Sequence, residues 1–315
     1  MANIQAVVVN PAAPARLALG EVAYPTTGPD DALVRVEAIS LNLGEVRNSQ
    51  AAQAGHRPGW DFAGVVEQAA ANGSGPRKGA RVVGMLNSGA WAQIVAAPTS
   101  ILAELPAAVS FAQASTLPIA GLTALRALEK GGSLLEKPVL INGASGGVGH
   151  LAVQIAHHMG AHVVAAVRRA SLVGMVQQAG AERVIVSEDL SNAAEFGPYD
   201  HILESVGGKA LGNALAMLKP WGMCVCFGSS GSYEATFDLR KFFLTGGATL
   251  YGFIIFSELA RNPGSADLAR LARMVADGTL HPEITVEAPW TQIGEIAQRL
   301  LNRQISGKAV LHVSG

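Results

Sequence analysis

A glycine-rich turn follows an apolar segment near the middle of the chain. Residues 138–142 lead into Gly143-Ala144-Ser145-Gly146-Gly147-Val148-Gly149, and apolar residues then recur at three- and four-residue spacing up to Gly160. This pattern predicts a strand, a tight turn and an amphipathic helix. Free backbone N–H groups and the positive end of the helix dipole would then meet where a pyrophosphate can bind. The predicted cofactor contacts of this turn are Ser145, Gly146, Gly147, Val148 and Gly149.

The segment after this helix indicates which dinucleotide the turn would bind. The turn itself has Ala144 in place of the first glycine of GxGxxG, and such turns also occur for packing reasons alone. A second apolar segment, residues 162–167, ends at Arg168-Arg169, at the position where an NAD site carries Asp or Glu. Two guanidiniums can instead bind a 2′-phosphate through charge-assisted hydrogen bonds. The sequence predicts NADP(H), with Ser171 as a further donor; alternatively, both arginines only end the strand in solvent.

Composition and charge exclude several classes of partner. The chain has 315 residues, 49% of them hydrophobic, which is enough for two domains with substantial cores. A formal net charge of −1 argues against a dedicated surface for nucleic acid or anionic membranes. No apolar run reaches the roughly 20 residues that cross a bilayer, and residues 1–5 do not resemble a signal peptide. We therefore expect a soluble, cytoplasmic protein with a small-molecule substrate.

The residues that could bind a metal do not form a pattern. The only cysteines, Cys224 and Cys226, lie on one apolar segment and would face the same side of a strand, which favours core packing. Four-cysteine zinc sites are excluded by this count. His158 and His162 have HxxxH spacing, but Gly160 ends the helix between them. No metal is predicted.

The order of elements indicates two kinds of architecture in one chain. Residues up to about 112 contain short apolar strands, such as 32–38 and 80–84, between turn residues, which is typical of β-rich folds. Helices and strands alternate afterwards, which predicts a doubly wound parallel sheet. The final apolar strand, 308–313, is expected to return to the first domain. The other expected elements are helices at 121–130, 210–218 and 266–277 and strands at 184–186, 201–203, 223–227 and 249–255.

Five motifs occur in an order and spacing that resemble a known family. They are Gly59-Trp60-Asp61-Phe62-Ala63-Gly64-Val65-Val66, Lys78 to Gly84, Leu117 to Ala124, the glycine turn, and Ser306-Gly307-Lys308-Ala309-Val310-Leu311. Together they resemble the medium-chain dehydrogenase/reductase superfamily, most closely its zinc-independent NADPH:quinone oxidoreductase branch. The resemblance implies an α/β protein with a GroES-like catalytic domain, residues 1–112 and 282–315, and a Rossmann domain, residues 113–281. It also implies NADPH-dependent reduction of a quinone or of the C=C bond of an enone.

Departures from the wider superfamily bear on the chemistry. Zinc-dependent alcohol dehydrogenases have a ligand cysteine near the position of Asn42 and Gly-His-Glu where this chain has Gly59-Trp60-Asp61. Because neither asparagine nor tryptophan binds zinc well, a Lewis-acid mechanism is not expected. A tyrosine common in the quinone oxidoreductase branch is replaced by Arg47, which favours a more polar or anionic acceptor.

Without a metal, the predicted chemistry depends on orientation and on donors to the acceptor oxygen. The catalytic candidates are Asn42, Arg47 and Thr123, with water or a cofactor ribose hydroxyl as the proton source. Each has a structural alternative: Asn42 as a turn residue, Arg47 as a solvated charge, and Thr123 as a helix residue bonded to its own backbone. Tyr251 and His150 are expected to be structural. The resemblance adds Gly207, Gly208, Gly228, Ser229, Phe253 and Lys308 to the cofactor shell.

Three functions remain open, together with one expectation about assembly. The first is the quinone or enone reductase, the second a non-zinc reductase of another conjugated acceptor such as an enoyl thioester, and the third a weakly catalytic NADPH-binding protein. Residues 248–256 form an apolar segment without charges, predicted as the edge strand of the parallel sheet. In the resembling family this edge pairs with its two-fold mate, so a homodimer is expected.

Overall fold

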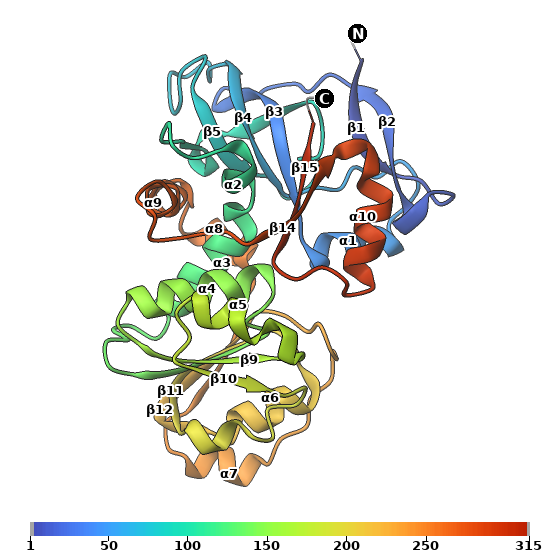
Figure 1. Cartoon of the computed structure of the whole chain (residues 1–315). Helices are drawn as coiled ribbons and strands as arrows, with labels where there is room; N and C mark the ends of the chain where they lie inside the picture. Colours follow the sequence, from blue (N-terminus) through green and yellow to red (C-terminus); the bar gives the residue numbers. More distant parts are fainter. Residues whose placement is uncertain (1–2, 314–315) are drawn as a thin grey trace. The chain divides into compact units, whose positions relative to one another are not determined.

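The chain folds into two compact units. The computed structural model describes residues 3–313; its first unit takes the chain up to Leu122, Leu259–Gly278 and the segment from Pro282 onward. The second unit consists of Thr123–Glu258 and Thr279–His281. The blue and red segments of Figure 1, from the two ends of the chain, both belong to the first unit. This division assigns 113–122 and 259–278 to the first unit, whereas the sequence analysis placed them in the Rossmann domain.

A seven-stranded sheet is the framework of the first unit. Its strands run in the order β14-β15-β3-β4-β5-β7, with β6 also paired to β3, and a separate hairpin joins β1 to β2. Neighbours along this sheet are antiparallel except β14 and β15, which are parallel. The bounds are β1 Asn3–Val9, β2 Leu17–Ala23, β3 Asp31–Leu41, β4 Asp61–Gln68, β5 Arg81–Met85, β6 Ile94–Pro98, β7 Ala103–Glu104, β14 Ile284–Pro289 and β15 Lys308–His312.

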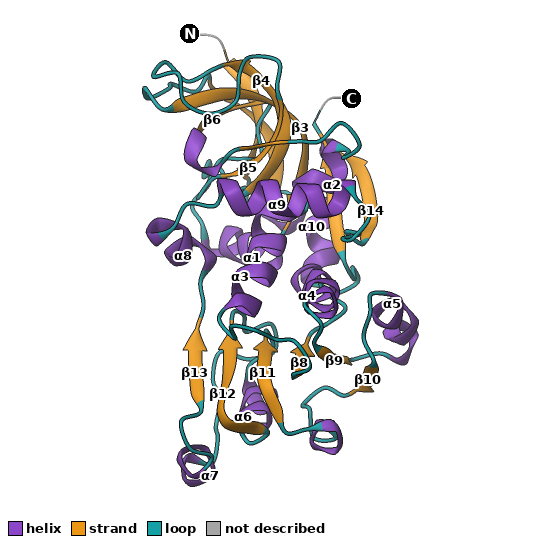
Figure 2. Ribbon diagram, turned by 90° about the vertical axis from the view of Figure 1, so that its left-hand side faces the viewer, coloured by secondary structure: helices purple, strands orange, loops and turns teal. Residues whose placement is uncertain are grey.

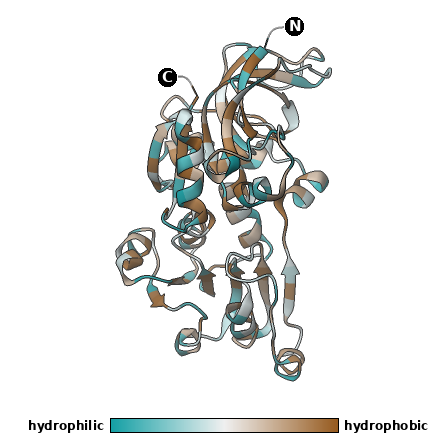
Figure 3. Ribbon diagram, turned by 90° about the vertical axis from the view of Figure 1, so that its right-hand side faces the viewer, coloured by the Kyte–Doolittle hydropathy of each residue, from teal (hydrophilic) through white to brown (hydrophobic). Residues whose placement is uncertain are grey.

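Runs of consecutive buried residues on the central strands give this sheet its core. Trp91 and Phe62 are fully buried in a cluster that also takes Val34 and Leu311 from β3 and β15. Figure 3 shows hydrophobic residues, in brown, along these strands. The last strand, β15, pairs with β3 from Ala309 opposite Leu41 to His312 opposite Ala38, so the carboxyl end of the chain completes the sheet that its first third begins.

The second unit contains a six-stranded parallel sheet. Its order is β10-β9-β8-β11-β12-β13, so the chain moves outward in one direction, returns, and continues in the other from β8. The sequence prediction of a doubly wound sheet is confirmed, and Figure 2 shows several of these strands side by side. The reversal between β8 and β11 is the point at which such sheets bind ligands. The bounds are β8 Pro138–Asn142, β9 His162–Val167, β10 Arg183–Val186, β11 Tyr199–Glu204, β12 Leu218–Cys226 and β13 Thr249–Gly252.

The helices predicted from the sequence lie close to their expected positions, although several helices and strands begin or end at other residues. The helix expected over 210–218 ends at Leu215, because β12 already begins at Leu218. The strand expected over 249–255 ends at Gly252, and Ile255 begins a helix. No helix in the described residues 3–313 is long and apolar enough to span a membrane. The α-helices are α1 Leu43–Ala51, α2 Phe111–Ser115, α3 Leu122–Glu129, α4 Gly147–His158, α5 Val173–Gln178, α6 Gly208–Leu215, α7 Leu239–Leu244, α8 Ile255–Arg261, α9 Ser265–Ala276 and α10 Ile293–Leu301, and a π-helical segment, η3, spans Leu117–Gly121.

Candidate functional site

The glycine turn connects the central strand β8 to the start of α4. Gly143 has a φ of +74°, which only glycine adopts readily, and α4 begins at Gly147 after Gly146 as its N-cap. No side chain caps this helix, so its first N–H groups are left for a ligand. The structure therefore brings the predicted residues Ser145 to Gly149 together as a cradle for an anion.

Close packing explains why this turn can have alanine at position 144 but requires glycine at position 149. A Cβ on Gly149 would lie 2.2 Å from the Gly143 carbonyl oxygen and 2.7 Å from the Ala144 Cα, so glycine is required there. Ala144 has room because its methyl is buried in the core, while its N–H donates to the Ala166 carbonyl on β9 at 3.1 Å. The first turn of α4 can pack this closely against the turn that follows β8 only with a bare backbone at position 149.

The two predicted phosphate-binding arginines lie on the neighbouring strand. β9 pairs with β8 so that Ala166 is opposite Asn142, and Arg168 and Arg169 follow at the same carboxyl edge of the sheet. Both arginines and Ser171 are exposed. They are placed where a ribose phosphate next to the glycine turn can be reached.

Two loops on the other side of β8 are joined through their backbones. The loop after β11 (residues 205–208) accepts hydrogen bonds from the loop after β12 (residues 228–232): Ser230 N donates to Ser205 O at 2.9 Å, and Gly231 N to Val206 O at 2.8 Å. We call these two segments the loop pair. A Cβ on Gly207 would lie 2.1 Å from the Ser232 oxygen, and the φ of Gly207 is +77°. The predicted cofactor residues Gly207, Gly208, Gly228 and Ser229 all belong to this pair.

Phe253 lies at the same carboxyl edge, just after β13. Its side chain is buried, and its N–H donates to the Cys226 carbonyl at 2.9 Å. Tyr251, two residues earlier, donates to Glu258 at 2.5 Å, and the Lys130 ammonium lies 4.6 Å from the centre of the tyrosine ring. These contacts give Tyr251 the structural role that the sequence indicated.

A buried cluster of polar side chains occupies the first unit. The Lys308 ammonium donates to Asn42 Oδ1 at 2.6 Å and to the Leu41 carbonyl at 3.0 Å, and lies 3.6 Å from Asp61 Oδ2. Asn42 Nδ2 donates to Asp61 Oδ2 at 2.7 Å and to Glu45 Oε1 at 3.0 Å. Asp61 Oδ1 accepts the N–H of Ile119 in η3 at 3.0 Å. We call Asn42, Glu45, Asp61 and Lys308 the Lys308 cluster.

This buried cluster contains two carboxyl groups but only one ammonium. Burial raises the pKa of Glu45 well above its ordinary value, and the neighbouring Asp61 raises it further. Burial also raises the pKa of Asp61, although the Lys308 ammonium opposes that shift. The pKa of Lys308 is lowered by its own burial. Two carboxyl groups therefore share one ammonium, and the opposite charges on the two sides of Asn42 determine which end of its amide faces which partner.

These contacts give two of the predicted site residues partners within the protein. Lys308 was placed in the cofactor shell, but its ammonium is buried and engaged by Asn42, Leu41 and Asp61. Asn42 was proposed to donate to the acceptor oxygen, but both its N–H bonds point to carboxylates. The sequence analysis did not single out Glu45 and Asp61 as cluster members. The spacing Asn42-x-x-Glu45, which matches a capping box, was the available signal.

The other two catalytic candidates belong to different units. Arg47 is partly buried on α1 in the first unit, two residues after Glu45 of the Lys308 cluster. Thr123 is buried on α3 in the second unit. Their roles toward a substrate stay predictions.

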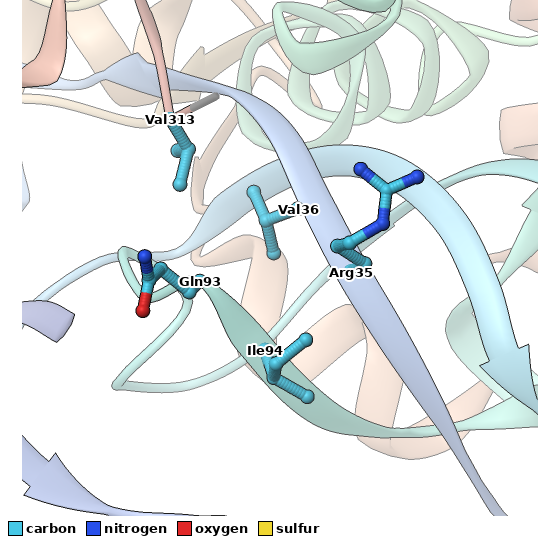
Figure 4. A pocket seen from close by; sticks show the side chains of 5 residues that line it. All are labelled: Arg35, Val36, Gln93, Ile94 and Val313. Atoms are coloured by element: carbon cyan, nitrogen blue, oxygen red, sulfur yellow. The ribbon is translucent and has the colours of Figure 1, made fainter. Parts of the chain in front are cut away.

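Among residues 3–313 no group of three or more His, Cys, Asp or Glu side chains is arranged to hold a metal ion. Burial raises the pKa of both thiols, Cys224 and Cys226, as expected for packed rather than reactive cysteines. Figure 4 shows a pocket in the first unit that Arg35 helps to line. Arg35 is also paired with Glu67 at 3.4 Å. The lining of this pocket is completed by Val36, Gln93, Ile94 and Val313 and contains no carboxylate, imidazole, thiol or hydroxyl group.

Comparison with known proteins identifies the family. The model described as alcohol dehydrogenase GroES-like domain matches residues 28–107, and the one described as zinc-binding dehydrogenase matches residues 147–276. The chain belongs to the medium-chain dehydrogenase/reductase superfamily, in its quinone oxidoreductase-like branch. Quinone oxidoreductase from Homo sapiens is 27% identical over 305 residues, covering 92% of each chain. The 2-methylene-furan-3-one reductase of Solanum lycopersicum is 27% identical over 312 residues, covering 92% of this chain and 74% of that protein.

Solved structures of this superfamily have the same fold. The quinone oxidoreductase of Coxiella burnetii superimposes with a TM-score of 0.84 over 99% of this chain and 100% of that one, at 24% identity. The predicted α/β class, with a GroES-like domain and a Rossmann domain, is therefore confirmed.

Replacing Lys308 tests the Lys308 cluster. K308M leaves two buried carboxyls without their ammonium, and we expect a loss of about 3–5 kcal/mol in the free energy of unfolding at pH 7. The loss should shrink as the pH falls toward 5, because carboxyls with raised pKa values become neutral and no longer need the ammonium. Urea denaturation measures both effects.

A second lysine provides the control. Lys219 pairs with Asp200 at 2.7 Å near the surface, so K219M should cost about 0–1 kcal/mol. Equal losses for the two variants would contradict the assignment of a buried cluster.

Proposed function

We propose that this protein is a zinc-independent, NADPH-dependent oxidoreductase that transfers hydride to a quinone or to the C=C bond of an α,β-unsaturated carbonyl. Membership of the superfamily supports a nicotinamide cofactor and oxidoreductase activity. Relatives named as quinone oxidoreductases and as a 2-methylene-furan-3-one reductase support the class of acceptor. The finer choices, NADPH and the acceptor, depend on particular residues.

The observation that carries the cofactor choice is the pair of exposed arginines at the end of β9. Arg168 and Arg169 follow the strand beside the glycine turn, where a carboxylate would repel a 2′-phosphate. Guanidiniums hold a phosphate through charge-assisted, bidentate hydrogen bonds. The bare backbone at Gly146, the second glycine of the fingerprint, also fits the pyrophosphate of the same dinucleotide.

Hydride transfer requires a fixed geometry and stabilisation of the acceptor oxygen. A bound NADPH supplies the hydride. The glycine turn and the loop pair would hold the cofactor through backbone groups, so that the chain contributes its orientation. Since Asn42 has both N–H bonds engaged, Arg47 and Thr123 are the proposed donors to the developing oxyanion. The proton comes from water or from a ribose hydroxyl of the cofactor.

Zinc independence is supported by the donor chemistry in the first unit. The side chains at the two positions compared with zinc ligands are an amide, Asn42, and an indole, Trp60. Asn42 is held between an ammonium and two carboxyls by the contacts of the Lys308 cluster. A conjugated enoyl thioester stays the second candidate acceptor, because hydride delivered to its β-carbon also develops charge on a carbonyl oxygen; the third possibility is a weakly catalytic NADPH-binding protein.

An acceptor panel tests the proposed activity. NADPH oxidation is followed with a benzoquinone, a larger polycyclic quinone, a simple enone and a crotonyl thioester, each with and without a strong chelator. We expect turnover of a quinone or the enone, unchanged by chelation. Activity only with the thioester would favour the second candidate, and silence throughout with NADPH still bound would favour the third. Zinc that leaves the protein together with activity would contradict the metal-free mechanism.

The arginine pair gives a sharper prediction about the cofactor. Loss of a charge-assisted phosphate pair costs about 1.5–3 kcal/mol, or roughly 10- to 150-fold in affinity. R168A/R169A should weaken NADPH binding by at least that factor and change NADH binding little, as measured by fluorescence titration. Equal affinity of the unmodified protein for NADH and NADPH would rule out this choice of cofactor.

An exposed apolar surface at one end of the parallel sheet supports a homodimer. β13 is an edge strand, and Leu250 and Ile254 are 40% and 64% exposed. Trp221, beside the start of this strand, is 84% exposed, and Phe243 and Leu244 on α7 are also exposed. An uncovered apolar edge favours pairing with a second copy, and an isologous contact closes after two chains.

Charge substitutions at this edge test the dimer. L250K or I254K should convert a dimer into monomers or aggregates, because a buried interface would then contain unpaired ammonium groups. V186K, at an exposed position of the opposite edge strand β10, should leave the oligomeric state unchanged. Light scattering checks the masses; a mass near 32.5 kDa for the unmodified protein at micromolar concentration would contradict the proposal.

A further inference from the structure

A buried carboxylate lies at the end of β11 and has no part in the chemistry described so far. Glu204 is the last residue of this strand, between β8 and β12 in the sheet, and is fully buried. Its Oε1 accepts the Val206 N–H and Asn142 Nδ2, and its Oε2 accepts the Gly207 N–H, each at 2.8 Å. Both carboxylate oxygens are thus used to hold the first residues of the 205–208 loop.

This arrangement costs more free energy than a simple turn requires. Burial raises the pKa of Glu204, and in the described part of the chain its hydrogen-bond donors are neutral N–H groups rather than cations. Desolvating a carboxylate without a cation costs free energy that a glycine or asparagine in a turn would not require. We therefore expect this carboxylate to have a role beyond forming the turn, and that role depends on its two oxygens, which fix two successive N–H groups.

Glu204 fixes one peptide that the other loop fixes from the opposite side. In the peptide between Val206 and Gly207, the Gly207 N–H is held by Glu204, while the Val206 carbonyl accepts Gly231 N at 2.8 Å and Ser232 N at 3.1 Å. Ser205 links the same loop to β8, since its hydroxyl donates to the Asn142 carbonyl at 3.2 Å. The carboxylate is the buried end of a network that joins the ends of β8, β11 and the segment after β12.

The position of the loop pair relates this network to one half of the cofactor. Arg168 and Arg169 follow β9, on one side of β8, whereas the loop pair follows β11 and β12, on its other side. A dinucleotide bound across the reversal point has its two nucleosides on opposite sides of the glycine turn. If the arginines bind the adenosine phosphate, the loop pair faces the nicotinamide half.

We propose that Glu204 is a positioning residue for the nicotinamide half of the dinucleotide, acting by locking residues 205–208 of the loop pair. This inference rests on the proposed function, because it takes NADPH as the ligand. A Gln at position 204 keeps the size of the side chain but replaces one acceptor oxygen by an N–H donor, which opposes either Val206 N–H or Gly207 N–H. The loop should loosen while the glycine turn and the arginines stay in place.

Two ligands separate this role from a general effect on folding. The affinity of E204Q is measured for NADPH and for adenosine 2′,5′-bisphosphate, which carries the adenosine and its 2′-phosphate without nicotinamide. We expect NADPH binding to weaken on the order of tenfold and bisphosphate binding to stay within about twofold. E204D, which keeps both oxygens on a shorter side chain, should show the same selective loss and serves if E204Q does not fold.

A matched carboxylate provides the control. Asp238 also accepts a backbone N–H, that of Lys241 at 3.0 Å, and caps α7, which precedes the amino end of β13. D238N should leave both affinities unchanged. Unchanged NADPH affinity in the Glu204 variants, or parallel weakening of both ligands, would overturn the inference while leaving the proposed function intact. If the unmodified protein binds the bisphosphate but not NADPH, or neither, the proposed function itself fails and the inference with it.

Discussion

The buried ammonium of Lys308 is the charge on which the organisation of the first unit depends. It joins β15 to the end of β3 and to the first turn of α1, across 266 residues of sequence. Asn42, which accepts from this ammonium, donates to Glu45 and Asp61, and Asp61 also accepts the N–H of Ile119 in η3. Four separate parts of the chain are therefore positioned by one set of hydrogen bonds that water cannot replace.

That cluster also limits the chemistry available near Asn42. Its amide is held in one orientation, because a reversed amide would bring its NH₂ against the ammonium and its oxygen against two carboxyls. An asparagine fixed in this way gives shape to its surroundings rather than a hydrogen bond to a substrate. The donors that stabilise an acceptor oxygen must then come from elsewhere, which is why Arg47 and Thr123 keep their places in the proposed mechanism.

Local patterns explain what the sequence predicted well. The glycine turn, the strands around it and the arginines after β9 depend on residues close together in the chain, and their order alone determines a parallel sheet. The role of Lys308 could not be predicted in this way, because its partners are set by the pairing of β15 with β3. Glu204 was missed for a similar reason: its sequence neighbours are apolar or small, and only the burial of β11 shows that the carboxylate faces inward. The end of β13 at Gly252 was mispredicted because apolar composition does not separate a strand from the first turn of the following helix.

The two segments of the loop pair are joined to each other by backbone hydrogen bonds, so their side chains can change in evolution more freely than their lengths. Hydrogen bonds from Ser230, Gly231 and Ser232 N–H groups to Ser205 and Val206 carbonyls do not depend on which side chains those positions carry. Substitutions on the 228–232 segment can therefore alter the lining of the proposed cofactor site without displacing the backbone of the segment. Gly228 and Gly231 are exceptions, because a Cβ there would lie 3.0 Å from the facing backbone. Insertions are a different matter, because a longer loop on one side would lose its register with the other. Evolution of new acceptor preferences on this scaffold should proceed through point changes at the serines and leave the two loop lengths coupled.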